Sequence, residues 1–302
     1  MIRPPRLRAG DIVRIVAPSG PVPREGFEAG LRVLRGRYDV RFDDGVFQRD
    51  GFLAGTDQRR LDELTAALAD PEARAVLMAR GGYGLLRLLP FLDPALLRAS
   101  PRPLVGFSDG TALLAFAARA GVAAIHGPVL TQLGGLSEPD QRALFQILEE
   151  PSPGMLLADL DELIPGRVQG RLLGGNLEVF SRLLGTPFLP DLAGAVLFIE
   201  DSGERPYRVD RLITHLDLAG VFGAVSAVLV GDFSGCTEPE ALRDGSPRAE
   251  DVLLDRLGRL PIPVALGAAF GHGSRNAALP YGCLVELDTR HGTLSALEGA
   301  VR

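Results

Sequence analysis

The sequence predicts an α/β fold of two domains: an N-terminal domain with a mostly parallel sheet flanked by helices, and a C-terminal mixed α/β domain with an antiparallel end. Short apolar runs alternate with helical periodicity through residues 1–150, as in parallel strands joined by helices. The run Pro151-Ser152-Pro153-Gly154 then interrupts this alternation, and apolar strands on both sides of His291-Gly292 indicate a closing hairpin. We therefore place the N-terminal domain at 1–150, a connector at 151–166 and the C-terminal domain at 167–302.

The composition limits the class of protein. The chain has 302 residues, of which 46% are hydrophobic, so it can bury a sizeable core. Its formal net charge of −6 and the lack of a basic stripe interleaved with aromatic residues argue against a nucleic-acid partner. No run of about 18 apolar residues and no apolar signal-peptide core occur in the sequence. We therefore expect no membrane partner, a cytoplasmic location and a small-molecule partner.

Few residue types with special reactivity are present. Cys236 and Cys283 are too few for a disulfide framework or a cysteine zinc site, and both are expected to be buried. The sequence contains no lysine, which excludes a P-loop lysine, a Schiff base and a serine–lysine dyad. We expect no metal and no cofactor. A serine nucleophile in this chain would need histidine or a carboxylate as its base.

The first elements lead to a glycine-rich loop. We expect a strand at 11–16, a helix at 27–34, a strand at 38–42, a helix at 57–69 that Thr56 begins, and a strand at 75–79. The last of these ends in Arg80-Gly81-Gly82-Tyr83-Gly84, whose backbone N–H groups could approach a ligand as an anion nest or as part of an oxyanion hole. A plain glycine turn is the simpler alternative. Ser19, in the loop after the first strand, is interpreted as a turn or cap residue.

Ser108 lies on a tight turn between a strand and a helix. The apolar run that ends at Phe107 predicts the strand, and the alanine- and leucine-rich run after Gly110 predicts the helix. Gly106 and Gly110 complete a G-x-S-x-G pattern, in which small neighbours permit a strained backbone that exposes the serine hydroxyl. The pattern indicates a nucleophile elbow, with the N–H of Asp109 as an oxyanion donor. The alternative is that Ser108 or Asp109 only caps the helix.

The remaining elements supply candidate acids and bases. A strand ending at His126 and a helix at 139–149 precede the connector. In the second half, the apolar strand 195–199 ends in Glu200 and Asp201, and another apolar run leads to Gly271-His272-Gly273. Strands are also expected at 167–173 and 225–230, and helices after Gly174-Gly175-Asn176, at 207–218 with His215, and at 248–260. His126, His215 and His291 have structural or surface explanations of their own.

Three groups at strand ends suit nucleophilic catalysis. A serine hydroxyl needs a base within hydrogen-bonding distance and a carboxylate that holds the base in the correct tautomer. Ser108, His272 and either Glu200 or Asp201 could supply these roles. The glycines around His272 suit an exposed imidazole, although a lone histidine in a tight turn more often binds backbone groups. The candidate chemistry is therefore acyl transfer.

Short motifs along nearly the whole chain agree in order and spacing with a known family. The motifs are Gly10-Asp11 to Ser19, Arg80-Gly81-Gly82-Tyr83-Gly84, Gly106-Phe107-Ser108-Asp109, His126-Gly127-Pro128, Gly174-Gly175-Asn176, Ile199-Glu200-Asp201, Tyr207-Arg208-Val209-Asp210-Arg211, and Phe270-Gly271-His272-Gly273 with Leu279-Pro280-Tyr281-Gly282 after it. In these motifs the chain resembles the LD-carboxypeptidases, which comprise murein tetrapeptide carboxypeptidases and microcin C self-immunity peptidases.

The resemblance implies a Ser-Glu-His triad at Ser108, Glu200 and His272, and it makes Asp201 only a neighbour of the triad acid. It also implies oxyanion donors on the backbone of Gly82 and Asp109. The site would lie in the cleft between the two domains, often within a homodimer. No metal or cofactor is implied.

The implied substrate is a cytoplasmic murein tetrapeptide from peptidoglycan recycling, from which the enzyme releases the terminal D-alanine at an L,D bond. The terminal carboxylate of such a peptide needs a cation. Because the chain has no lysine, we assign this role to an arginine such as Arg80 or Arg205.

Three other functions stay open at this point. A self-immunity peptidase of the same family would cleave aminoacyl-nucleotide conjugates, although the chain has no tryptophan to stack on a base. An α/β-hydrolase-like esterase shares the G-x-S-x-G pattern and the order serine, acid, histidine, but its H-G-G-G motif is absent here. A non-catalytic protein could bind an anion through the glycine loops. A fluorophosphonate probe separates this last class, because a binding protein has no activated serine.

Overall fold

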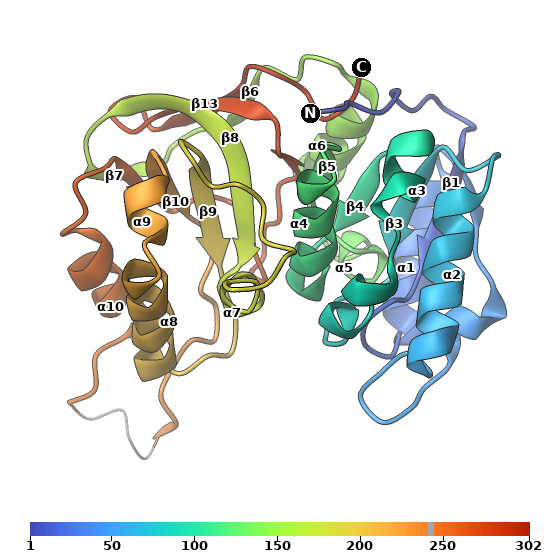
Figure 1. The fold of residues 1–302 in the computed structure, drawn as a ribbon, viewed down its shortest axis with the longest axis horizontal. Coiled ribbons are helices and arrows are strands. Elements are labelled where there is room, and N and C mark those ends of the chain that lie inside the picture. The colour runs from blue at the N-terminus through green and yellow to red at the C-terminus, as the bar shows by residue number, and fades with distance from the viewer. Residues whose placement is uncertain (241–244) are drawn as a thin grey trace.

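The computed structural model describes residues 1–240 and 245–302. Two sheets lie side by side, one built mainly from the blue and green N-terminal half and the other from the yellow and red C-terminal half (Figure 1). This confirms the predicted mixed α/β fold class. Within the described residues, no helix is both long and apolar enough to cross a membrane.

The first sheet has the strand order β12-β5-β4-β3-β1-β2. Strands β1 to β5 are parallel, whereas β12 pairs antiparallel with β5. All four residues of β3 are buried, as expected for a parallel strand covered on both faces. The strands are β1 (Ile12–Val16), β2 (Asp39–Arg41), β3 (Ala75–Met78), β4 (Leu104–Gly106), β5 (Ala124–His126) and β12 (Leu279–Tyr281).

Helices connect these strands in the predicted alternation. The helix expected to begin at Thr56 does so, and the Thr56 side chain accepts a hydrogen bond from the backbone N–H of Arg59. The helices of this half are α1 (Arg24–Arg35), α2 (Asp57–Ala69), α3 (Pro94–Ala99), α4 (Thr111–Arg119), α5 (Leu130–Leu133) and α6 (Glu138–Glu149). Short 3₁₀ turns are η1 (Asp44–Phe47), η2 (Leu85–Arg87), η3 (Leu89–Phe91) and η4 (Ser108–Gly110).

The second sheet has the strand order β6-β14-β13-β8-β9-β10-β11-β7. Its central strands β8 to β11 are parallel, and the strands on both sides of them are antiparallel. The hairpin expected around His291-Gly292 is formed by β13 and β14. The strands are β6 (Met155–Leu157), β7 (Asp161–Ile164), β8 (Arg167–Asn176), β9 (Val196–Glu200), β10 (Ala227–Val230), β11 (Val264–Leu266), β13 (Leu284–Asp288) and β14 (Thr293–Ala296), and the helices are α7 (Leu177–Ser181), α8 (Pro206–Leu218), α9 (Val221–Ala224) and α10 (Ala249–Leu257).

Two segments pair with sheets in a way that the sequence did not predict. Residues 151–166, expected as a connector, contain β6 and β7, which pair with β14 and β11 in the second sheet. In the other direction, β12 comes from the C-terminal half and completes the first sheet. The division at 1–150, 151–166 and 167–302 stays a prediction. The C-terminal half contributes β12 to the first sheet, so the two halves are joined by strand pairing.

One hydrophobic core crosses the boundary between the sheets. It includes Phe116 of α4, Leu173 of β8 and Phe198 of β9. Helix α4 packs on β4 and β5 of the first sheet and also on β8 and α7 of the second, and Figure 1 shows it between the two. The turn that begins α4 therefore lies at the junction of the two halves, where residues of both can meet.

Candidate active site

The turn at Ser108 has the strained backbone that the sequence predicted. Ser108 has φ +59°, a left-handed conformation that is rare for a residue with a side chain. A Cβ on Gly106 would lie 3.1 Å from the sulfur of Met78, and one on Gly110 only 2.8 Å from it. Both glycines of the pattern therefore let the turn pack closely on the Met78 side chain, which a larger residue would displace. Helix α4 has no side-chain cap, so the capping alternative for Ser108 and Asp109 is wrong.

The side chain of Asp109 points into the protein and joins three segments. Its carboxylate accepts hydrogen bonds from the Ser19 hydroxyl at 2.6 Å and from the backbone N–H of Leu85 at 2.9 Å. Burial raises the pKa of Asp109, although both of these hydrogen bonds act in the opposite direction. Ser19, interpreted from the sequence as a turn residue, is fully buried and fixes the position of the elbow.

The glycine loop after β3 lies directly against the elbow. Strands β3 and β4 are neighbours, so the two loops share one sheet edge as expected. A Cβ on Gly81 would lie 2.7 Å from Cβ and 2.9 Å from Oγ of Ser108. Gly82 is exposed and has φ +108°. In the described part of the chain, neither the N–H of Gly82 nor that of Asp109 has a hydrogen-bond partner, so each amide has an unused donor.

Glu200 and His272 form a hydrogen-bonded pair. Glu200 is the last residue of β9 and is fully buried, and its Oε2 lies 2.7 Å from Nδ1 of His272. The ring of His272 packs on that of Phe107, with the centroids 4.4 Å apart. This contact brings the imidazole beside the elbow. Within the described residues, Oγ of Ser108 makes no hydrogen bond to His272, as is common before a substrate is bound.

The charge around His272 favours its protonated form. Burial by itself lowers the pKa of His272, but the hydrogen bond and charge of Glu200, together with Asp201 and Asp232, outweigh burial and leave the pKa raised. The carboxylate on Nδ1 also fixes the neutral tautomer in which Nε2 has a free lone pair. The pair therefore has the arrangement of a general base and the acid that orients it.

The loop that contains His272 is held from the N-terminal half. Gln132 of α5 donates a hydrogen bond to the carbonyl of Gly271 at 3.2 Å and accepts one from Asn276 at 2.7 Å, while Asn276 accepts from the N–H of Gly271 at 3.2 Å. A Cβ on Gly273 would lie 2.8 Å from the Asp232 carboxylate, so this glycine lets the loop lie on Asp232. Sequence reasoning did not identify Gln132 and Asn276, because a single amide side chain carries no local pattern.

Asp201, the other candidate acid, has different partners. Its carboxylate accepts hydrogen bonds from the Asn176 side chain at 3.0 Å, from the N–H of Glu178 at 3.0 Å and from the N–H of Ser202 at 2.8 Å. Burial raises the pKa of Asp201 to about 6. Asp201 thus joins β9 to the start of α7, and of the two adjacent carboxylates only Glu200 contacts His272.

The remaining histidines and cysteines lie elsewhere. His215 is exposed, and His291 binds Asp288 three residues earlier in its turn, at 2.9 Å. Cys236 and Cys283 are both buried and unpaired, as predicted. No group of three or more histidine, cysteine or acidic side chains within the described residues could hold a metal ion.

The two candidate arginines differ in how they are bound. Arg80 is exposed and donates one hydrogen bond to the carbonyl of Pro21, at the wall of a cavity of about 600 Å³ that also includes Gly82 and Tyr83. Arg205 donates to Glu238 through Nε at 2.8 Å and Nη2 at 2.6 Å. Arg80 therefore has donors that face a cavity next to the glycine loop, whereas Arg205 is already paired with a carboxylate.

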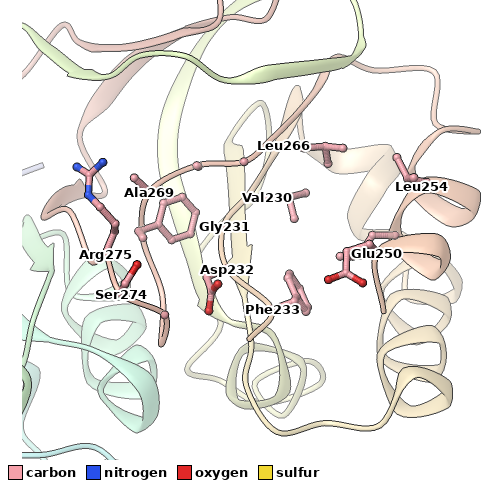
Figure 2. A pocket seen from close by; sticks show the side chains of 15 residues that line it. Val230, Gly231, Asp232, Phe233, Glu250, Leu254, Leu266, Ala269, Ser274 and Arg275 are labelled. Atoms are coloured by element: carbon pink, nitrogen blue, oxygen red, sulfur yellow. The ribbon is translucent and has the colours of Figure 1, made fainter. Parts of the chain in front are cut away.

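A second cavity, of about 540 Å³, is lined in part by Ser274 and Arg275 of the loop after His272 (Figure 2). Phe233, Val230 and Leu266 form its apolar part, and the carboxylates of Asp232 and Glu250 also face it. Gly273 lines this cavity, but neither Ser108 nor His272 does. One cavity thus includes Gly82 of the glycine loop, and the other includes Gly273, next to His272.

Replacing Gly81 with alanine tests how closely the two loops must fit. The added Cβ would overlap Ser108, while Gly81 itself does not have a positive φ, so the effect comes from the contact rather than from the backbone. We expect kcat of the candidate acyl transfer to fall by about 100-fold, because displacement of a reacting group by about 1 Å has this effect. Steady-state kinetics with Gly223→Ala as the control measures it, since a Cβ on Gly223 meets no atom within 4 Å. Equal rates for the two variants would contradict the prediction.

Family models and known proteins match this chain over most of its length. Residues 13–127 match the model of the LD-carboxypeptidase N-terminal domain, and residues 169–287 match that of the C-terminal domain. The chain is 36% identical to a murein tetrapeptide carboxypeptidase of Pseudomonas aeruginosa, over 89% of this chain and 91% of the relative.

Solved structures show the same similarity. The crystal structure of a muramoyltetrapeptide carboxypeptidase from Oxalobacter formigenes is 31% identical, with a TM-score of 0.81 over 94% of this chain and 97% of that one. The microcin C7 self-immunity protein in complex with aspartyl sulfamoyl adenosine is 25% identical, with a TM-score of 0.90 over the whole of both chains.

Proposed function

The chain belongs to the LD-carboxypeptidase family of serine peptidases, and we propose that it releases the terminal D-alanine from a murein tetrapeptide by hydrolysing the L,D bond with a Ser108-His272-Glu200 triad. The observation that carries this proposal is the pair of buried Glu200 and half-buried His272, 2.7 Å apart, packed through Phe107 on the strained turn of Ser108. We further propose that it acts on cytoplasmic peptides in peptidoglycan recycling, and that it does so as a homodimer.

The reaction begins with proton transfer from Ser108. Nε2 of His272 takes the hydroxyl proton as Oγ attacks the carbonyl carbon before D-alanine, and Glu200 stabilises the imidazolium through Nδ1. The negative charge that develops on the carbonyl oxygen is stabilised by the N–H groups of Gly82 and Asp109. Removing one such donor typically raises the barrier by about 3 kcal/mol.

The second half of the reaction uses the same groups in reverse. His272 gives its proton to the nitrogen of the departing D-alanine, the carbon–nitrogen bond breaks, and an ester between Ser108 and the tripeptide remains. His272 then removes a proton from water, whose oxygen attacks the ester carbonyl, and the proton returns to Oγ. The products are D-alanine and the tripeptide, and the enzyme is restored.

Mass spectrometry of purified protein incubated with a murein tetrapeptide tests the proposed substrate. From the tetrapeptide with a terminal D-alanine, we expect free D-alanine and tripeptide to appear in equal amounts. From the same peptide ending in L-alanine, we expect neither free alanine nor tripeptide. Absence of D-alanine while a simple ester is hydrolysed would contradict the peptidase proposal in favour of an esterase.

One observation favours a nucleotide conjugate as a second candidate substrate. Phe52 and Tyr83 are both exposed on the cavity that includes Gly82, with ring centroids 5.6 Å apart, and could stack on a base. The self-immunity protein of similar fold was solved with aspartyl sulfamoyl adenosine. The same mass-spectrometric assay with this compound in place of the tetrapeptide separates the two candidates, through release of aspartate.

Replacing Arg80 with alanine tests the proposed binding of the terminal carboxylate. We expect kcat/KM for the tetrapeptide to fall by about 10- to 100-fold, as on loss of a charged hydrogen bond. For the peptide that ends in D-alaninamide, kcat/KM of this variant should change little, because that peptide carries no charge at its end. Arg290→Ala, at an exposed position of the C-terminal hairpin, is the matched control.

Arg205 remains the other proposed cation. If Arg205→Ala instead of Arg80→Ala removes the preference for the free carboxylate, the substrate must displace Glu238 from Arg205 on binding. An equal loss for the acid and the amide in the Arg80 variant would contradict the assignment.

A further inference from the structure

His126 lies next to the candidate site and contacts three aromatic rings. It is the last residue of β5, beside Gly106 of β4, and is fully buried. Three phenylalanine rings stand nearly perpendicular to its imidazole, with centroid distances of 5.3 Å to Phe107, 4.8 Å to Phe198 and 5.8 Å to Phe270. These are favourable edge-to-face contacts, so the four rings, the aromatic cluster, form one packed unit.

Each phenylalanine of the aromatic cluster stands one or two residues before a residue of the proposed triad. The pairs are Phe107 and Ser108, Phe198 and Glu200, and Phe270 and His272. Phe198 and Glu200 are also on the same face of β9, since side chains two apart in a strand point the same way. A single side chain thus contacts all three segments, which come from both halves of the chain.

The imidazole of His126 makes no ordinary polar contact. Neither of its ring nitrogens has a hydrogen-bond partner within the described residues. Burial, with a smaller contribution from the charge of His272, lowers the pKa of His126 to about 3, so the ring is neutral at physiological pH. A buried polar group without a partner costs free energy that an apolar side chain would not. Stability alone therefore does not explain a histidine here.

We propose that His126 is a positioning residue for the peptidase reaction, the centre of an aromatic cluster that holds the segments of Ser108, Glu200 and His272 in register across the two sheets. This inference rests on the proposed function. His126 acts through Phe107, on which the ring of His272 packs at 4.4 Å, and not by contact with the substrate.

The shape of imidazole suits this position. It is flat, so it fixes the angle of each perpendicular ring, and its N–H edge can point at the face of a phenyl ring in a weak N–H···π contact. Leucine has a comparable size but no flat face. Phenylalanine keeps the flat face, at the cost of a larger ring in a tightly packed core.

Kinetics of His126→Leu and His126→Phe test the proposal, with His215→Leu, at an exposed position of α8, as the control. We expect His126→Leu to lower kcat by about 10- to 100-fold with KM changed less than about threefold, because the bound substrate is unaffected while the reacting groups are displaced. His126→Phe should recover most of this loss, although it still has no ring nitrogen. Unchanged kcat in His126→Leu would overturn the proposal.

Folding and reactivity are measured separately. Thermal unfolding of each variant shows whether it folds, and the rate at which a fluorophosphonate labels Ser108 reports the nucleophile without any peptide. Equal losses of labelling in the leucine and phenylalanine variants, in step with their melting temperatures, would show a merely structural role and overturn the proposal. Labelling of both variants as fast as the wild type would also overturn the proposal.

Failure of the proposed function has a different signature. If the wild type is not labelled, the serine mechanism is wrong and this inference fails with it. If the wild type is labelled but releases no D-alanine, only the substrate assignment fails, and slower labelling of His126→Leu than of His126→Phe still supports the role of His126.

Discussion

Ser108→Ala is expected to lower kcat for D-alanine release by about 10⁴- to 10⁶-fold, which is the loss seen when the nucleophile of a triad is removed. Alanine takes away the hydroxyl that the proposed mechanism uses as its nucleophile. KM should change little, because the cavity beside Gly82 is untouched. The measurement is the rate of D-alanine release, with the protein concentration raised to detect the residual activity.

A matched serine variant shows whether the loss is specific. Ser226 binds the carbonyls of Gly194 and Ala195 just before the start of β10, at the opposite end of the strand from the site, so Ser226→Ala should retain wild-type kcat. A fluorophosphonate should label the wild type and Ser226→Ala but not Ser108→Ala. Residual activity of Ser108→Ala within about tenfold of the wild type would exclude Ser108 as the nucleophile.

Glu200→Gln is expected to lower kcat by about 10⁴-fold, the effect of an amide in place of the triad carboxylate. Glutamine has nearly the same shape, but it presents an N–H or a neutral carbonyl to Nδ1 of His272 and so loses the charge that stabilises the imidazolium. Asp201→Asn should lose far less, because Asp201 binds Asn176 and backbone N–H groups instead of the imidazole. Equal losses in the two variants would contradict the assignment of Glu200.

The pH profile of the same variant tests the electrostatics. The pKa of His272 is raised chiefly by Glu200 against the effect of burial, and the neutral imidazole is the form that accepts a proton. Activity of the wild type should therefore be present above this raised pKa and lost as the pH falls through it. Without the carboxylate the pKa falls, so the acid limb of kcat/KM in Glu200→Gln should move to lower pH. An acid limb that does not move would show that another group titrates there.

The strand ends and glycine turns of the site were predictable because their signals are local. Ser108 stands between two glycines after an apolar run, and Glu200 ends another such run. In a parallel sheet, strand ends of this kind gather at one edge, so the sequence alone predicts that Gly81 and Ser108 lie together. The choice of Glu200 over Asp201 came from the family resemblance, since adjacent carboxylates look alike in sequence.

What could not be predicted depends on contacts between distant residues. The hydrogen bond from Ser19 to Asp109 joins positions 90 residues apart, and neither residue shows a pattern that points to the other. Strand β6 has exposed or half-buried residues at two of its three positions, so residues 151–166 looked like coil. Strand β12 has three residues, too few for any periodicity to show that it belongs to the other half of the chain.

The position of β12 determines when the molecule can be completed during synthesis. The first five strands of the first sheet leave the ribosome early, but β5 keeps an open edge until Leu279–Tyr281 has been made and has paired with it. Such an edge can pair with other chains. The segment with His272 emerges just before β12, so the last stages of translation both close this edge and bring the proposed base to the proposed nucleophile. While this edge is open, the proposed triad is therefore also incomplete.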